Sequence, residues 1–415
     1  MKKLFAFLLF ALAPNFAQAQ HTQNVTFTHV DKIVNATFTA PSLMGKFPVI
    51  IINPGSGPND RDGTIPMQGG NIQCLYPQLL GTTLKSYKGL GDALVGAGYA
   101  VLRYDKLEYT YSTSLGELTF KKLWLPVESA INYVKTRADV DTSRIILLGH
   151  SEGAALIPII AEGRTDVRAL ISLAGARTPF DSLLAYQLVY IAERCSGDVT
   201  MAKMQSAQIL RYFHLIRSNT WNASTPPLFG VPAAVWGDYV RATDSVALRY
   251  NRANLPALFV GLEQDFNVPP AELARFKHDV RITKDFWNIP GLNHYMTPND
   301  DPHVSKALAD TIIYWLHQQG ISTGIRSEKK DRGELLKVAP NPFTQQFSVS
   351  LLKTSAHNVE ISVKNILGQE VVKHFLKSDG EISRATFNGD NLPPGVYLLD
   401  VHIDGERVTQ KVVKQ

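Results

Sequence analysis

Ser151 is the residue of this sequence best placed to act as a nucleophile, because it is the centre of a G-x-S-x-G pentapeptide at 149–153. The pentapeptide follows an aliphatic run at 145–148 and precedes an apolar helical segment at 154–161. A sharp turn between a strand and a helix exposes a serine hydroxyl, and the two glycines let the backbone close tightly. We therefore expect a nucleophilic serine; the alternative is a tight turn with an idle serine.

A serine hydroxyl is a weak nucleophile at neutral pH and needs hydrogen-bond donors for the oxyanion that its attack creates. A glycine-rich stretch at 53–63 follows another aliphatic run, 49–52. Such a loop can present a backbone N–H to the serine, so we expect Ser56 to supply one donor and Glu152 the second. An ordinary polar turn is the alternative, since Gly, Pro, Asn and Asp dominate turns.

The base that activates such a serine needs a carboxylate to orient it. Asp265 ends the stretch 258–265, whose first part is apolar and is typical of a strand. We assign the acid to Asp265. Glu263, two residues nearer the strand, is the second choice, and a solvated surface acid is the remaining alternative.

His294 is the expected base, because it lies in a loop after the apparent strand 280–289. The chain order is then serine, aspartate, histidine, which is the order that accompanies this kind of serine turn. His278 falls in a predicted helix, and His303 lies at the start of the final one, where capping or surface roles are commoner. An idle loop histidine is the alternative for His294.

Aliphatic runs alternate with segments of helical period between about residues 48 and 290, which predicts an α/β fold. The runs are typical of strands buried on both faces of a mostly parallel sheet, and they are 49–52, 100–104, 145–148, 170–173 and 258–260. The alternating stretch 24–39 predicts an antiparallel pair at the sheet edge. About eighty residues separate the last two runs, far more than one crossover helix needs. We expect a helical cap at about 177–255; a plain packing insertion is the alternative.

The last eighty or so residues, 336–415, have a different composition. Runs such as 347–351, 359–363 and 396–401 alternate apolar and polar residues and are separated by Gly, Pro and Asp turn signals. We expect a small all-β sandwich there. The charged stretch 323–335 is typical of an exposed linker, so the catalytic domain is expected to span 20–322.

The N-terminal residues 1–19 have the form of a secretory signal, with two lysines, an apolar run at 4–13 and small residues at its end. The run is too short to cross a hydrocarbon layer of about 30 Å, so we expect no permanent membrane anchor. The formal net charge is +5 without a long basic run, so we expect no nucleic acid partner. The sequence leaves open whether Cys74 and Cys195 form a disulfide.

Together, the loop at 55–63 and the pentapeptide resemble the α/β-hydrolase superfamily, and within it esterase-like hydrolases with a G-S-G-P-x-D-R-D-G loop and a G-H-S-E-G turn. The resemblance covers about residues 24–320 and implies a serine hydrolase. Relatives usually have a histidine before the first loop glycine, where this chain has Pro54. The hydrogen bonding of this loop is therefore in question, although the oxyanion donor itself is a backbone group. Relatives also often have a glycine-containing turn after 103–107, so the tyrosine-rich loop 106–115 is expected to shape the site differently.

The C-terminal segment resembles the sorting domain of type IX secretion substrates. Three signatures occur in the expected order, beginning at Val338, Asn365 and Leu392. The resemblance implies recognition by the type IX machinery and export through the periplasm of a Gram-negative bacterium to the medium or cell surface. An adhesive or carbohydrate-binding sandwich is the alternative.

The sequence thus predicts a secreted serine hydrolase that cleaves small-molecule carboxylic esters through an acyl-enzyme on Ser151. We expect no metal and no nucleotide cofactor, because HExxH, a P-loop and a strand-coupled GxGxxG are missing. A serine peptidase of the same fold, acting on short peptides, and a non-catalytic binding protein are the alternatives. Fold alone cannot separate the two enzymes.

Overall fold

The computed structural model describes residues 20–112, 114–321, 336–352, 359–365, 369–376, 382–403 and 406–414. The predicted signal at 1–19 and the predicted linker at 323–335 lie outside the described residues. The chain divides into two compact units, Met1–Gly324 and Ile325–Gln415. Across the parts of the chain that the structure describes, we find no helix with the length and hydropathy needed to cross a membrane.

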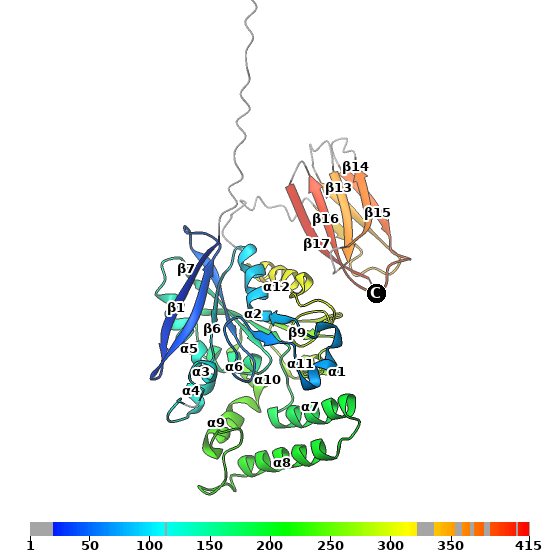
Figure 1. Cartoon of the computed structure of the whole chain (residues 1–415). Helices are drawn as coiled ribbons and strands as arrows, with labels where there is room; N and C mark the ends of the chain where they lie inside the picture. The colour runs from blue at the N-terminus through cyan, green and yellow to red at the C-terminus, as the bar shows by residue number, and fades with distance from the viewer. Residues whose placement is uncertain are drawn as a thin grey trace, which may run out of the picture. The chain divides into compact units, whose positions relative to one another are not determined.

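A mixed sheet forms the centre of the first unit (Figure 1), and within the described residues it has eight strands in the order β1-β2-β6-β3-β7-β8-β9-β10. An antiparallel edge is formed by β1 (His21–His29) and β2 (Lys32–Ala40), and β2 also runs antiparallel to its inner neighbour. The remaining strands are parallel to one another, and they are β3 (Phe47–Asn53), β6 (Ala100–Tyr104), β7 (Val140–His150), β8 (Val167–Leu173), β9 (Ala257–Leu262) and β10 (Lys284–Ile289). The predicted mostly parallel sheet with an antiparallel edge is confirmed.

Helices cover both faces of this sheet, which explains why its strands are continuous aliphatic runs. In β3, Val49 and Ile51 belong to the core on one face, and Ile50 and Ile52 to the core on the other. The first face is covered by α5 (Pro126–Lys135), α6 (Glu152–Ala161), α10 (Val246–Ala253) and α11 (Ala271–Asp279). The second face is covered by α2 (Ser86–Gly96) and α12 (Lys306–Gln318).

The long connection from β8 to β9 is helical. It contains α7 (Phe180–Cys195), α8 (Thr200–Arg217) and α9 (Ala233–Thr243), which we call the cap, and then α10. Figure 1 shows α7 and α8 side by side. A disulfide joins Cys195, the last residue of α7, to Cys74 in the short helix α1 (Gly70–Leu75). The two cysteines therefore pair, and the bond links one end of the cap to a segment outside it.

Two antiparallel sheets form the second unit. In its described residues they have the orders β11-β12-β15 and β14-β13-β16-β17. The strands are β11 (Leu336–Ala339), β12 (Gln346–Leu352), β13 (Val359–Asn365), β14 (Glu370–Leu376), β15 (Ile382–Asn388), β16 (Gly395–Ile403) and β17 (Glu406–Lys414). Phe347 and Phe387 from the first sheet share a core with Ile361 and Leu399 from the second. This arrangement confirms the predicted small all-β sandwich.

Candidate active site

Ser151 stands at a strained turn between β7 and α6, with φ 54° and ψ −121°. Its N–H donates to Leu173 O at 2.9 Å, and its own carbonyl accepts from Ala154 N at 3.0 Å. A Cβ atom at Gly149 would overlap the backbone of Gly153, and one at Gly153 would overlap the backbone that ends β3. The glycines of the pentapeptide are therefore required by close backbone approach, and the turn exposes the serine to a cavity.

Asp265 and His294 form a buried pair at the ends of two neighbouring parallel strands, β9 and β10. His294 Nδ1 lies 2.7 Å from Asp265 Oδ2, and the two side chains are 10% and 0% exposed. The other carboxylate oxygen accepts from Val268 N at 2.9 Å. This arrangement fixes the imidazole with Nδ1 toward the carboxylate and leaves Nε2 to accept a proton.

The other acid and the other histidines considered from the sequence lie elsewhere. Glu263 is exposed, and its carboxylate accepts from Gly291 N at 2.8 Å. His278 and His303 have side chains that are 83% and 85% exposed, each beside a neighbouring aspartate. The structure thus brings Asp265 to His294 and keeps the alternative residues apart from that pair.

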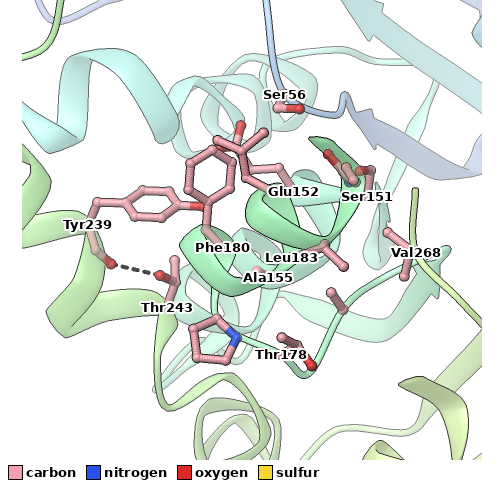
Figure 2. A pocket seen from close by; sticks show the side chains of 14 residues that line it. Ser56, Ser151, Glu152, Ala155, Thr178, Phe180, Leu183, Tyr239, Thr243 and Val268 are labelled. Atoms are coloured by element: carbon pink, nitrogen blue, oxygen red, sulfur yellow. Dashed lines mark hydrogen bonds between the residues drawn. The ribbon is translucent and has the colours of Figure 1, made fainter. Parts of the chain in front are cut away.

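Two cavities meet at Ser151. The first, of about 180 Å³, is lined by both Ser151 and His294 together with Ser56, and we call it the histidine-side cavity. Its other walls are mostly polar and include Asn59, Ser86, Gln187, Asn267 and Tyr295. The second, of about 130 Å³, lies under the cap and is lined by Ser151, Glu152 and apolar residues of α7; we call it the cap cavity (Figure 2).

A third and larger cavity, of about 680 Å³, shares Ser56, Glu152 and Phe180 with the cap cavity. Figure 2 shows Phe180 and Glu152 between Ser151 and Tyr239 of the cap. We call this space the apolar cavity, because most of its remaining wall is hydrophobic: Leu115, Leu118, Leu123, Trp124, Phe229, Val231 and Trp236. A ligand group at the serine can therefore extend toward an apolar space that His294 does not line.

Ser56 lies in the loop after β3, and side chains hold the two peptide groups on either side of Gly55. Gly55 N–H donates to the Tyr87 hydroxyl at 2.9 Å. Gly55 O accepts from Asn59 Nδ2 at 3.1 Å and from Lys106 Nζ at 3.2 Å. This chain has Pro54 at the position where a histidine was expected from the resemblance. The bonds from Tyr87, Asn59 and Lys106 hold the loop here.

Glu152, the second predicted donor, is the first residue of α6. Its N–H is one of those that a helix leaves without an internal acceptor, and the helix dipole favours negative charge there. Its side chain is buried: Oε1 accepts from Trp124 Nε1 at 3.1 Å, and Oε2 lies 3.3 Å from Lys106 Nζ. Burial and the Glu152 carboxylate hold the pKa of Tyr239 well above its usual range.

A hydrogen-bonded chain connects the loop, the serine turn and the histidine. Because Tyr87 Oη accepts from Gly55, its hydrogen is directed to His150 Nδ1, 3.0 Å away. His150 Nε2 then donates to His294 O at 3.0 Å. Burial, together with the nearby His294, lowers the pKa of His150 well below its usual value, so this ring is neutral.

Sequence reasoning gave no role to Tyr87, His150 or Trp124, and it considered Lys106 only as part of the loop 106–115 that was expected to shape the site. Only Lys106 carried a usable signal: it follows the fully buried strand β6, and a buried lysine is rare unless it is paired. Among the described residues there is no group of three or more His, Cys, Asp or Glu side chains placed to hold a metal ion.

Comparisons with known proteins concern the fold and the kind of enzyme. Residues 337–415 match the family described as a secretion system C-terminal sorting domain, and residues 127–275 match the BAAT / acyl-CoA thioester hydrolase C-terminal family. Esterase EstD of Thermotoga maritima is 26% identical over 310 residues, which cover 70% of this chain and 68% of that esterase.

Solved structures with similar folds include Est1E from Butyrivibrio proteoclasticus, with 18% identity, coverage of 71% of this chain and 98% of that chain, and a TM-score of 0.44. They also include the acylaminoacyl peptidase of Pyrococcus horikoshii, with 13% identity, coverage of 72% and 41%, and a TM-score of 0.44. The mixed sheet and the serine turn give the first unit an α/β-hydrolase fold, the similar sequences are those of esterases and hydrolases, and residues 337–415 match a secretion sorting domain.

Proposed function

We propose that the protein hydrolyses carboxylic esters through an acyl-enzyme on Ser151. The observation that carries the proposal is the buried pair of His294 and Asp265, whose histidine lines the same cavity as the strained serine. His294 Nε2 takes the hydroxyl proton as Ser151 attacks the ester carbonyl carbon, and Asp265 holds the imidazolium. The N–H groups of Ser56 and Glu152 stabilise the oxyanion.

The rest of the cycle uses the same groups. When the tetrahedral intermediate collapses, the bond to the alcohol oxygen breaks and His294 gives its proton to that oxygen. A water molecule then loses a proton to His294 and attacks the acyl carbon. Collapse of the second intermediate breaks the bond to Ser151, returns the proton to its Oγ and releases a carboxylic acid.

The cavities suggest how the substrate is oriented at Ser151. The leaving alcohol has to lie where His294 can protonate it, which is the polar histidine-side cavity. The acyl group then lies on the other side of the serine, toward the cap cavity and the apolar cavity beyond it. We therefore propose a substrate that joins an apolar acid to a polar alcohol.

Thioester hydrolysis is the second candidate, because residues 127–275 match a family described by acyl-CoA thioester hydrolysis. It would use the same serine, histidine and aspartate with a thiol as the leaving group. A peptidase of this fold is the third candidate from the sequence, and it differs in having to protonate an amine.

We further propose that the protein acts outside the cell. In this proposal it is exported through the periplasm of a Gram-negative bacterium. The match of residues 337–415 to a secretion sorting domain supports this location. In this proposal the second unit is a sorting signal that the secretion machinery recognises, and it takes no part in the chemistry.

Purified full-length protein should be assayed with matched acyl esters, acyl thioesters and short peptide amides, with Ser151→Ala beside it. We expect ester turnover to be the fastest and to fall by at least about 10³-fold in Ser151→Ala, since the remaining donors alone support little catalysis. Activity of Ser151→Ala within tenfold of wild type would contradict the mechanism. Faster turnover of thioesters or peptides would move the assignment to that class.

A further inference from the structure

Lys106 is a buried lysine that no step of the proposed mechanism uses. It follows β6, and its side chain is 6% exposed. Its ammonium lies 3.2 Å from Gly55 O, 3.3 Å from Glu152 Oε2 and 3.7 Å from Glu108 Oε1. Burying an ammonium group is costly unless it is paired and hydrogen-bonded, so these three acceptors account for its presence.

The contact with Gly55 bears directly on the oxyanion hole. Gly55 O and the N–H of Ser56 belong to the same planar peptide group, and in a trans peptide they point in opposite directions. A donor fixed on the oxygen therefore fixes the direction of the N–H. A cationic donor also polarises the group, which strengthens the hydrogen bond that the N–H can give.

Asn59 alone does not hold this peptide. Its Nδ2 lies 3.1 Å from Gly55 O, but it is also 2.8 Å from Ser56 O and 3.1 Å from Gly57 O, so its two hydrogens are shared among three carbonyl groups. The ammonium of Lys106 is the charged partner of Gly55 O. Its own backbone N–H donates to Asn59 O at 3.0 Å, which ties the lysine to the loop at a second point.

The contact with Glu152 brings the second donor into the same arrangement. The N–H of Glu152 is the other predicted oxyanion donor, and its carboxylate is held between Lys106 and Trp124 Nε1. A single ammonium group thus binds both segments that carry the donors, the loop after β3 and the start of α6. These segments are otherwise far apart in the sequence, near residues 55 and 152.

We infer that Lys106 is a positioning residue for the oxyanion hole, one that orients the Ser56 N–H through the Gly55 carbonyl and fixes its separation from the Glu152 N–H. The inference rests on the proposed serine mechanism. It assigns to Lys106 no contact with the reacting atoms and no proton transfer. Lys106 also lines the apolar cavity, which is why the test uses two acyl chain lengths.

The charge that this role needs is maintained. Burial alone would lower the pKa of Lys106, but the carboxylates of Glu108 and Glu152 outweigh burial and raise its pKa above the usual value. The side chains that face Glu152 from other packed elements are Trp124 and Tyr239, and burial holds the pKa of the tyrosine well above its usual range. Lys106 is therefore a cation at neutral pH.

The test compares Lys106→Met with Lys106→Arg in the full-length enzyme, using an acetyl ester and an octanoyl ester of the same phenol. We expect kcat of Lys106→Met to fall about 10- to 100-fold, somewhat less than the loss of a whole oxyanion donor, with KM changed by less than about threefold. The fall should be equal for both esters. Lys106→Arg keeps the charge and should recover part of kcat.

A boronic acid inhibitor supplies the decisive measurement, because it binds serine hydrolases as a tetrahedral adduct that resembles the transition state. We expect its affinity to fall in proportion to kcat/KM in Lys106→Met, while inhibition by the carboxylic acid product stays within about threefold. A purely structural role would not separate these two inhibitors. Unchanged boronate affinity, or a loss confined to the octanoyl ester, would overturn the inference.

Lys106→Met leaves Glu152 without its cation, so the single variant can fail to fold. Lys106→Met/Glu152→Gln removes both charges and keeps the backbone N–H of residue 152. It is expected to fold and to show the same loss of boronate affinity; wild-type affinity in this folded variant overturns the inference. The proposed function is tested separately. If it is wrong, Ser151→Ala keeps its hydrolytic activity, whatever the Lys106 variants show.

Discussion

At the scale of single residues, the chemistry depends on how each side chain is held. Asp265 is fully buried, with one carboxylate oxygen on His294 Nδ1 and the other on Val268 N. Replacing it by Asn puts an amide against the ring and favours the wrong tautomer of His294. We expect Asp265→Asn to lower kcat by about 10⁴-fold, as in serine triads generally.

Glu263→Gln is the matched control for that change, because this carboxylate is exposed and its bond goes to Gly291 N. Its kcat/KM should stay within about threefold of wild type, since surface substitutions seldom have larger effects. A large loss in Glu263→Gln with a small one in Asp265→Asn would reverse the assignment of the acid.

His150 makes the stability of the protein depend on pH. Its pKa is well below the usual value in the folded state, so the unfolded chain binds a proton near pH 6.5 that the folded chain does not. Stability from this residue is complete above that pH and is lost as pH falls toward the folded pKa, by at most about 1.4 kcal/mol per pH unit. We expect His150→Gln to be less stable at pH 8 and to lose less stability between pH 6.5 and 5.

Denaturant unfolding at several pH values measures this effect, with the exposed residue His214 changed to Gln as the control. The control should follow the wild-type dependence on pH. If His150→Gln has the same dependence as well, the neutral buried ring is not the source of acid sensitivity.

The residues that could be predicted from the sequence are those whose chemistry is written in local patterns. Ser151 stands in a motif, and the structure places the aspartate and the histidine that the sequence singled out against each other. Tyr87 could not be found in this way, because it meets His150 across 63 residues and nothing near it differs from an ordinary helix. Contacts of that kind are set by how helices cover the sheet.

At the scale of elements, we expect the cap to select the acyl groups that fit beside the serine. Val231 is half-buried in the segment before α9 and lines the apolar cavity. In Val231→Trp the larger ring should fill part of that space. We expect kcat/KM for an octanoyl ester to fall at least tenfold while an acetyl ester stays within about twofold, since a few methylene groups in an apolar pocket have effects of this size.

Leu248→Trp is the control for this prediction, because Leu248 is exposed on α10 and does not line the cavity. It should leave both esters unchanged. Equal losses for both esters in Val231→Trp would show that the apolar cavity does not hold the acyl group.

The strands were predictable because burial on both faces makes them continuous aliphatic runs. The cap was predictable as helical from the length and period of the insert. Its shape was not, because between residues 233 and 253 the structure has two helices, α9 and α10, and residues of both belong to the core that α6 joins. Tertiary packing divides that stretch, and periodicity does not show the division.

At the scale of the whole chain, each of the two units has its own core. Every residue assigned a role in the chemistry belongs to the first unit. A chain ending at residue 325 should therefore hydrolyse a model ester with kcat/KM within about twofold of full length, since each unit can fold alone. In the native cell the same truncation should keep the enzyme from reaching the medium.

Turnover of the purified truncated protein and its distribution between periplasm and medium check these two expectations separately. Loss of turnover would make the β-sandwich part of the catalytic unit. If the truncated enzyme still reaches the medium, residues 337–415 are not the sorting signal.

The disulfide between Cys74 and Cys195 makes the structure of the cap depend on when this bond forms. It closes a loop with a sequence separation of 121, which corresponds to about 5 kcal/mol in the chain-entropy model. Such bonds form after a chain has left a reducing compartment. Before that step the C-terminal end of α7, which lies beyond the α7 residues that line the cap cavity, has no covalent link to α1. Under the proposed export, the covalent link between α7 and α1 is completed only after the chain has crossed the inner membrane.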